Sequence, residues 1–230
     1  MWKYVWVLIG FALGIQHLQA QQVILDEQFM DNRRNWDLVA DKRLDSKLGE
    51  GMFHIRGRSK STGSIFGQKV ILAKSQDYNM TLEIIHTGGA KNMGYGLVWG
   101  AKFNQQDYYA FLISANGKFT ILQRERGQFS QIKPWTSSKH ILKSKKPNVL
   151  SIEKRGEDLH FFINGYKVFS SAAERMRGNL SGILCFGSIK LSANRFMVTL
   201  PVPEEETGES GETGEPLEAT SEQESARSDG

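Results

Sequence analysis

The fold is decided by residues 94–127, "GYGLVWGAKFNQQDYYAFLISANGKFTILQRERG". Three runs in this stretch, at 95–103, 108–114 and 118–124, are short and rich in aromatic and β-branched residues. Residues typical of turns, among them Asn116 and Gly117, separate the runs. Such runs, closely spaced and bounded by turn residues, are typical of neighbouring strands in an antiparallel sheet.

The same pattern continues on both sides of this stretch. Further strand-like runs are "MTLEIIH" (80–86), "VLSIEK" (149–154), "LHFFI" (159–163) and "RFMVTL" (195–200). Apolar residues recur with a period of two far more often than with the helical period of 3.6. Only residues 170–178, "SSAAERMRG", resemble a helical turn. The chain is therefore predicted to be an all-β sandwich of two antiparallel sheets.

Two hairpin turns can be predicted from the dipeptides Asn116-Gly117 and Asn164-Gly165. Asn and Gly tolerate the positive φ angles of a two-residue turn. A two-residue turn at 116–117 would place Tyr109 opposite Arg124 and Asp107 opposite Arg126. Both faces of this hairpin would be apolar near the turn, so the hairpin should lie centrally in its sheet.

A central hairpin with two apolar faces raises the question of what its aromatic side chains contact. We expect one face to pack against the second sheet and the other to form a partly covered groove. Aromatic rings there could stack on sugar rings, and arginines could pair with carboxylate or sulfate groups. The alternative is that the aromatics simply fill the core and its rim. The candidate ligand-binding residues are Trp99, Tyr108, Tyr109, Arg124, Arg126 and Trp135.

The first twenty residues, "MWKYVWVLIGFALGIQHLQA", have the features of a cleaved secretion signal. Lys3 provides a positive charge, residues 5–15 are apolar, and Ala20 ends a signal-peptidase site. An uncleaved N-terminal anchor is the alternative, although the apolar run is short for a membrane span. We therefore expect a secreted or periplasmic protein. Its only cysteine, Cys185, allows no internal disulfide, so the core alone must stabilise it.

Charge is unevenly distributed between the predicted domain and the C-terminal segment. Residues 21–200 carry 27 Lys or Arg against 15 Asp or Glu, whereas residues 201–230 carry ten acidic residues and one arginine. The acidic segment has no aromatic residue and almost nothing apolar, so it is predicted to be a disordered tail. A basic exported domain favours an acidic glycan or protein surface as partner over nucleic acid.

Several motifs resemble the laminin-G-like, concanavalin A-like jelly-roll modules of exported bacterial proteins. The resemblance is carried by residues 92–129, 148–169 and 178–187, and by Phe29, Asn32 and Trp36 near the start. The module called 3-keto-disaccharide hydrolase is similar in the same places. Leu184 stands where the family pattern has a glycine. The resemblance implies a jelly-roll sandwich and, as a class, glycan binding.

The sequence offers no convincing catalytic or metal centre. Retaining glycosidases need two carboxylates about 5–5.5 Å apart, but Glu83 has Ile85 where a second strand-borne acid would stand. The histidines have no metal-ligand spacing, so no zinc site is predicted. Calcium binding stays open, because residues in the predicted turns of this chain carry oxygen atoms of the kind that calcium binds. They belong to Asp31, Asn32, Asp37, Asn104 and Asp107.

The resulting hypothesis is an exported, non-catalytic module that binds glycans or a partner in the cell envelope. One alternative is a glycoside hydrolase of the 3-keto-disaccharide type, which would need an acid and a base that the sequence does not place. The other is a protein-assembly module that uses the basic face or the acidic tail. Neither a cofactor nor a membrane span within the domain is expected.

Overall fold

The computed structural model describes residues 21–59, 63–143 and 145–201. The predicted signal at 1–20 and nearly all of the predicted tail, from residue 202 onward, lie outside the described residues. Within the described part, no helical segment has the length and hydrophobicity needed for a membrane crossing.

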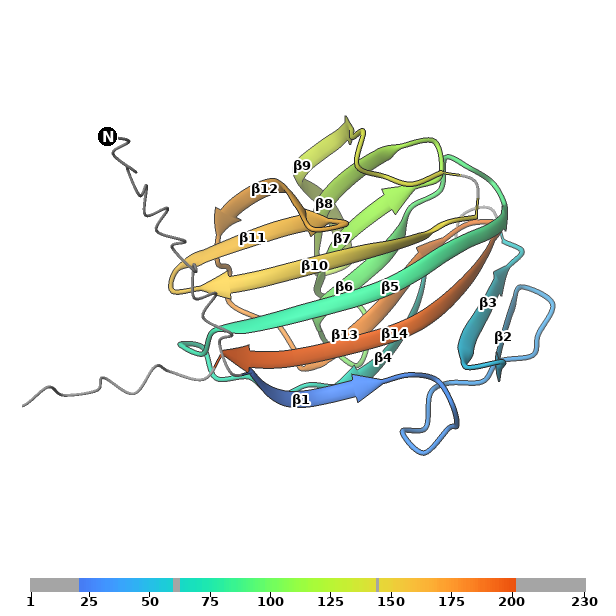
Figure 1. Ribbon diagram of the computed structural model, residues 1–230, viewed down its shortest axis with the longest axis horizontal. Coiled ribbons are helices and arrows are strands. Elements are labelled where there is room, and N and C mark those ends of the chain that lie inside the picture. The colour runs from blue at the N-terminus through green and yellow to red at the C-terminus, as the bar shows by residue number, and fades with distance from the viewer. Residues whose placement is uncertain (1–20, 60–62, 144, 202–230) are drawn as a thin grey trace, which may run out of the picture.

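The described chain is built from strands that form two antiparallel sheets (Figure 1). In chain order the strands are β1 Gln21–Glu27, β2 Leu44–Gly49, β3 Met52–Gly57, β4 Gly63–Lys69, β5 Tyr78–Gly89, β6 Tyr95–Ala101, β7 Tyr108–Ser114, β8 Lys118–Glu125, β9 Gln128–Ser137, β10 Pro147–Arg155, β11 Asp158–Ile163, β12 Tyr166–Ala172, β13 Leu180–Phe186 and β14 Ile189–Pro201. The eight-stranded sheet has the order β12-β11-β10-β5-β14-β3-β2, with β1 also paired to β14, and the six-stranded sheet has the order β4-β13-β6-β7-β8-β9. The all-β jelly-roll sandwich predicted from the sequence is confirmed.

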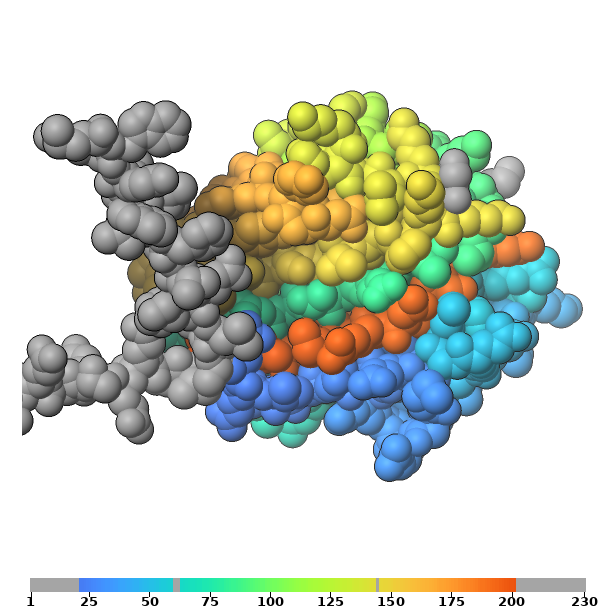
Figure 2. Space-filling model, viewed as in Figure 1, coloured from blue at the N-terminus to red at the C-terminus, as the bar shows by residue number. Residues whose placement is uncertain are grey.

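The eight-stranded sheet has one buried face and one half-exposed face, as its alternating sequence predicts. On β5, Met80, Leu82 and Ile84 are fully buried, whereas Thr81 and Glu83 between them are partly exposed. Strands that are distant in sequence form its outer surface side by side, as Figure 2 shows for β10, β5, β14 and β1. On β5 and β10 the partly exposed side chains of this face are mainly polar, for example Thr81, Glu83, Ser151 and Glu153.

The six-stranded sheet differs, because its central strands are buried on both faces. All seven residues of β6 and all seven of β7 are buried. The predicted central position of the β7–β8 hairpin is therefore confirmed, and something must cover the outer face of this sheet as well as the inner one.

The predicted register of the β7–β8 hairpin is wrong by one residue. Ser114 pairs with Lys118, so the loop has three residues, and Gly117 adopts φ +90° while its N–H donates to the Ser114 carbonyl at 2.9 Å. A type I turn followed by a left-handed glycine is the usual three-residue solution. Arg124 consequently lies opposite Tyr108 instead of Tyr109.

Two other expectations about local structure have different outcomes. The Asn164-Gly165 turn is confirmed, since both residues have positive φ (52° and 81°) and Ile163 pairs with Tyr166. The helical turn expected at 170–178 is wrong. Residues up to Ala172 belong to β12 and the remainder is irregular. Pairing of β12 with β11, for example Phe169 with Phe161, outweighs the local helical preference.

A cluster around Trp36 belongs to the main core and includes Phe29 and Asn32, which the sequence analysis named with it. The Trp36 ring contacts Phe29 edge-on at 5.1 Å between centroids and Phe53 at 5.5 Å. The side chain of Asn32 accepts from the Trp36 amide at 2.8 Å and donates to its carbonyl at 3.2 Å. The buried carboxylate of Glu27 accepts from the Trp36 indole at 2.9 Å and from the Phe29 amide at 2.6 Å. These residues therefore have structural roles.

Cys185 should be unreactive towards thiol reagents in the native protein. Its side chain is buried in β13, and burial raises the pKa of the thiol to about 12. Only the thiolate attacks such reagents, so at pH 8 neither ionisation nor access favours the reaction. We expect no labelling by an aromatic disulfide reagent until denaturant is added, followed by one equivalent per chain. Rapid stoichiometric labelling of the folded protein would contradict this.

Candidate functional site

A second apolar cluster lies on the outer face of the six-stranded sheet. Alternate residues of β7 point to opposite sides: Tyr109, Phe111 and Ile113 belong to the main core, whereas Tyr108 and Leu112 belong to the outer cluster. The buried members of the outer cluster are Ile65, Val98, Ala101, Tyr108, Ala110, Leu112 and Leu184. Most aromatic residues of the 94–127 stretch therefore fill the main core, and Tyr108 is buried on the outer face.

Aromatic side chains from neighbouring strands cover part of this outer cluster. Phe129 of β9 contacts Tyr108 and Phe186, with ring centroids 6.3 and 6.1 Å apart. The guanidinium of Arg124 lies over the Phe129 ring at 5.1 Å, and its N–H groups donate to the carbonyls of Gly127 and Gln105. Arg124 is therefore held in place by backbone oxygens.

Beside these rings the outer face is hollowed into a groove of about 620 Å³, called here the aromatic groove. Leu112 and Leu122 form apolar parts of its lining, and Phe129, Trp135 and Phe186 add the aromatic rings. The remaining lining residues are Asn92, Met93, Gly94, Ser130 and Gln131. Trp135 is 37% exposed and Phe129 is 52% exposed, so both rings are accessible to a ligand.

Trp135 reaches the aromatic groove because β9 is an irregular edge strand. The pairing of β9 with β8 shifts register on both sides of Ile121, and Pro134 precedes the tryptophan. A proline is tolerated there because an edge strand needs fewer backbone donors. The Trp135 ring lies against Gly94, where an added Cβ would come within 3.3 Å of the indole. Gly94 thus leaves room for the ring to lie close to the sheet.

The six predicted binding residues do not form one cluster. Trp99 and Tyr109 lie in the main core, 1% and 2% exposed, so their expected placement on an accessible surface is wrong. Both residues lie on strands that are buried on both faces. In such a strand the period-two alternation separates two sets of side chains, but it does not show which set faces the other sheet. Tyr108 lies on the outer face but is buried beneath Phe129, next to Arg124.

The other two predicted residues divide between the groove and the surface beyond it. Trp135 lines the aromatic groove, whereas Arg126 is exposed in the β8–β9 turn and is not part of the lining. The sequence reasoning missed Phe129, Phe186 and the two leucines. Phe129 and Trp135 both belong to β9, which has no clear period-two pattern, so this strand was not predicted. Ligand binding by any of these residues stays a prediction.

Asp107 should make the stability of the folded protein depend on acidic pH. An ion pair with the Lys102 ammonium at 2.7 Å, together with the Arg126 amide at 2.7 Å, lowers the pKa of its carboxyl group. A lowered pKa stabilises the fold above the unfolded pKa of about 3.9. This stabilisation is lost as pH falls through the folded value. We therefore expect the difference in Tm between the protein and Asp107→Asn to be largest near pH 6 and to shrink below pH 4. A constant difference would contradict this.

Four of the five residues considered for calcium use side-chain oxygens in hydrogen bonds within the protein, and the backbone carbonyl of Asp37 accepts from the Ser46 hydroxyl at 2.7 Å. Asp31 accepts from the Arg33 amide, Asn104 from the Gln106 amide, and Asn32 and Asp107 bond as described above. Among the described residues, no group of three or more His, Cys, Asp or Glu side chains could hold a metal ion. Calcium binding stays a prediction.

Glu83, the strand-borne acid considered for catalysis, lies on the outer face of the other sheet. Its carboxylate accepts from Asn194 at 2.8 Å. Asn194 stands in an irregular step of the β14–β5 pairing. Within the described residues, the lining of the aromatic groove contains no Asp or Glu.

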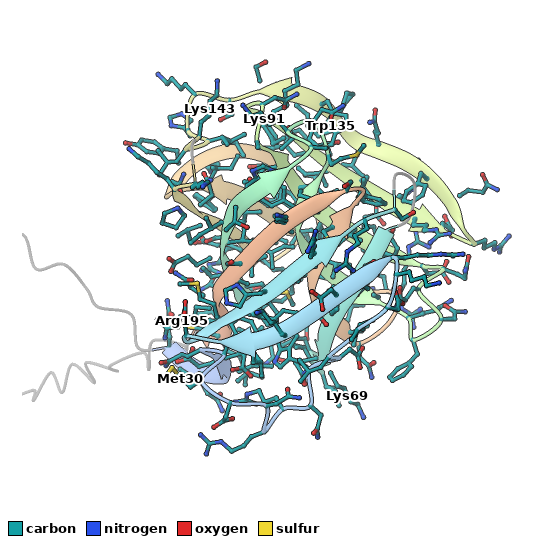
Figure 3. All side chains as sticks on the ribbon, turned by 90° about the vertical axis from the view of Figure 1, so that its right-hand side faces the viewer. Met30, Lys69, Lys91, Trp135, Lys143 and Arg195 are labelled. Atoms are coloured by element: carbon teal, nitrogen blue, oxygen red, sulfur yellow. The ribbon has the colours of Figure 1, made fainter. Side chains whose placement is uncertain are left out.

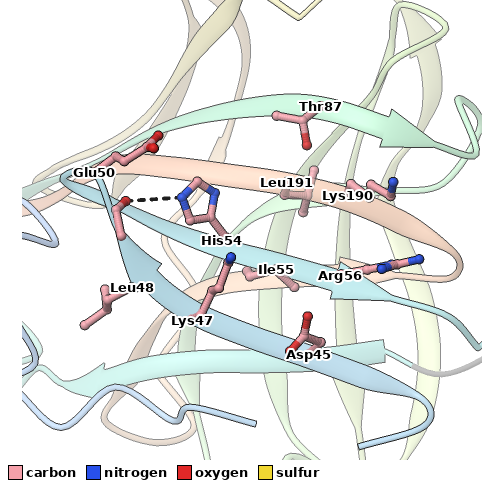
Figure 4. Close-up of a pocket in the computed structure, with 11 residues that line it drawn as sticks. Asp45, Lys47, Leu48, Glu50, His54, Ile55, Arg56, Thr87, Lys190 and Leu191 are labelled. Atoms are coloured by element: carbon pink, nitrogen blue, oxygen red, sulfur yellow. Dashed lines mark hydrogen bonds between the residues drawn. The ribbon is translucent and has the colours of Figure 1, made fainter. Parts of the chain in front are cut away.

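A second hollow of about 450 Å³ lies on the outer face of the eight-stranded sheet (Figure 4). His54 lies in it, within 3.2 Å of the Gly49 carbonyl and 2.9 Å of the Ser192 hydroxyl. Charges of both signs surround the histidine, from Asp45, Lys47, Glu50, Arg56 and Lys190. This hollow has acids beside the bases, and its lining has no Phe, Tyr or Trp to match the accessible rings of the aromatic groove.

The comparisons with known proteins bear on the fold. No family model matches the chain, and no curated protein matches it. The solved structures that it resembles include carbohydrate-binding modules and glycoside hydrolase domains. The sequence identities between this chain and those structures are far below the level that would indicate shared activity.

Three of these structures show how far the similarity extends. The CBM2 module of the evolved Dit protein of Lactobacillus casei BL23 phage J-1 has TM-score 0.54 and 8% identity, over 80% of this chain and 97% of that one. A protein of unknown function from Shewanella oneidensis MR-1 has TM-score 0.55 and 11% identity, over 77% and 85%. Xylan β-1,4-xylosidase from Bacillus halodurans C-125 has TM-score 0.54 and 13% identity, over 75% of this chain but only 38% of the enzyme.

Proposed function

We propose that this chain is an exported carbohydrate-binding module of the laminin-G-like, concanavalin A-like type, with the aromatic groove as its glycan site. The observation that carries the proposal is the accessible pair of rings, Trp135 and Phe129, at an apolar groove on a sheet face that is otherwise closed. Apolar pockets with a few polar groups are the usual form of ligand sites. Asn92, Ser130 and Gln131 supply hydrogen-bonding groups of the kind that sugar hydroxyls need.

The groove is better suited to binding than to glycoside cleavage. Cleavage by the usual mechanism needs a general acid and a second carboxylate on either side of the glycosidic bond. The described lining offers rings, amides and a hydroxyl, and Glu83 lies on the opposite sheet. The fold shared with carbohydrate-binding modules is consistent with this proposal, and export would place such a module where polysaccharides are found.

A glycan array with the full-length protein tests the proposal, followed by titration of the strongest neutral ligand. Trp135→Ala and Phe129→Ala should each weaken binding at least about tenfold, because a central aromatic contact typically contributes 2 kcal/mol or more. Phe103→Ala is the matched control, since Phe103 is 90% exposed and lies outside the groove. Equal binding by all three variants, or the absence of any glycan ligand, would refute a glycan site here.

A further inference from the structure

The end of the sandwich next to Trp135 carries a concentration of lysines. Lys91, Lys118, Lys139 and Lys143, called here the lysine cluster, are all exposed, and Lys145 and Lys146 follow in the same loop. Figure 3 shows Lys91 and Lys143 at the same end of the molecule as Trp135, with Lys69 at the opposite end. These lysines come from three segments: the loop between β5 and β6, the start of β8, and the loop between β9 and β10.

Hydrogen bonds and a close side-chain contact join these three segments to one another. The backbone N–H of Asn116 donates to the backbone carbonyl of Lys91 at 2.9 Å, and the backbone N–H of Ser138 donates to that of Gly117 at 3.0 Å. The Lys143 side chain lies so close to Gly117 that a Cβ there would be 3.0 Å from its Cε. The lysine cluster is thus held on connected backbone.

The lysine cluster also adjoins the aromatic groove. Lys91 directly precedes Asn92, Met93 and Gly94, which line the groove, and Gly94 touches the Trp135 ring. A polymer lying in the groove and leaving it at the Trp135 end would pass over these lysines.

The charge of the lysine cluster is not neutralised by the described part of the protein. Residues 90–94, 115–118 and 137–146 contain no Asp or Glu. No ion pair is found for any member of the cluster among the described residues. Elsewhere, Lys102, Lys154 and Arg195 each have a carboxylate partner. Gathering like charges disfavours the compact state, and an anionic ligand would relieve that repulsion.

We infer that the glycan bound in the aromatic groove is an anionic one, whose carboxylate or sulfate groups contact the lysine cluster. This inference rests on the proposed function and specifies its ligand class. A polysaccharide fits better than a membrane surface. The Trp135 ring packs along the sheet against Gly94, so it does not protrude as a side chain that inserts into a bilayer would.

Two matched pairs of probes test the inference with the full-length protein: polygalacturonate against its methyl ester, and dextran sulfate against dextran. The variant Lys91→Gln/Lys143→Gln should bind an anionic probe about 2- to 30-fold more weakly, because each exposed ion pair contributes about 0.2–1 kcal/mol. Trp135→Ala should also weaken binding of that probe. The control Lys47→Gln/Lys69→Gln removes the same charge away from the groove and should bind like the parent protein. Added salt should weaken binding to the anionic probe.

The outcomes separate this inference from the proposed function. If Trp135→Ala abolishes binding to a neutral glycan while the Lys91/Lys143 variant binds both anionic probes normally, the groove remains a glycan site and the inference is wrong. If the lysine variant weakens binding of the anionic probes but Trp135→Ala does not, the cluster is a simple ion exchanger and the inference is wrong, while the proposed function is decided by the titration with a neutral glycan. Retention of neither anionic probe also overturns the inference. So does a preference for vesicles of phosphatidylserine and phosphatidylcholine over both probes.

Discussion

Replacing Trp99 by alanine should lower the free energy of unfolding by about 3–5 kcal/mol, the range found when a large aromatic side chain is removed from a core. Trp99 is 1% exposed, stacks on Tyr109 at 5.6 Å between centroids and contacts Phe161 at 5.9 Å. Phe161 comes from the opposite sheet, so the cavity would open between the two layers. Urea denaturation followed by circular dichroism measures the effect.

Trp135→Ala is the matched comparison, because the same substitution removes a partly exposed ring from the aromatic groove. We expect a loss of less than about 1.5 kcal/mol in stability, since much of the indole already contacts water. The two substitutions should therefore have different effects. The Trp99 variant should lose stability, whereas the Trp135 variant should lose glycan binding and remain folded. A stable Trp99→Ala protein with impaired binding would instead restore the original prediction that this residue contacts ligand.

Removing the buried carboxylate of Glu27 should be the second large perturbation. Glu27→Ala leaves the Trp36 indole and the Phe29 amide without their acceptor in a buried site. Hydrogen bonds to a charged group contribute about 1.5–3 kcal/mol each, so we expect a total loss of roughly 2–4 kcal/mol once the site relaxes. Phe29 has φ +56°, a strained conformation for a bulky residue, and the Glu27 contact helps to hold it.

Two variants sharpen the Glu27 experiment. Glu27→Gln retains one acceptor oxygen but turns an NH₂ group towards the other donor, so its loss should lie between those of the parent and the alanine variant. Glu50→Ala removes an exposed carboxylate and should change stability by less than about 0.5 kcal/mol. If Glu27→Ala were no worse than Glu50→Ala, the network around Trp36 would not stabilise the fold.

The sandwich could be predicted because its strands carry their own signals. Residues 80–86 and 159–163 have period-two apolar residues, residues 108–114 form a continuous run of apolar and aromatic residues, and each stretch lies within a strand of the structure. The register of β7 against β8 could not be predicted, because "ANG" supports either a two-residue or a three-residue loop. A shift of one residue changes the cross-strand partner of every side chain, here moving Arg124 from Tyr109 to Tyr108.

The site was less predictable than the fold because it depends on contacts between distant segments. Trp99 and Trp135 look alike in the sequence, yet one is enclosed between the sheets and the other lines a groove. Phe186 and Phe129 meet across 57 positions of sequence, and no local pattern indicates that contact. The edge strand β9 alternates poorly because both of its faces are largely exposed. It therefore lacks the periodic signal that identifies buried strands.

The pairing of β1 with β14 determines how this module would be presented when it is tethered. Gln21 lies opposite Pro201, so the chain enters and leaves at a single pole. At its other end β14 pairs Ile189 with Gly89, one residue before the loop that contains Lys91. Anything joined before Gln21 or after Pro201 therefore attaches at the pole remote from the lysines. A support coupled at that pole would leave them, and the Trp135 ring beside them, directed outward to a polymer in the surrounding medium.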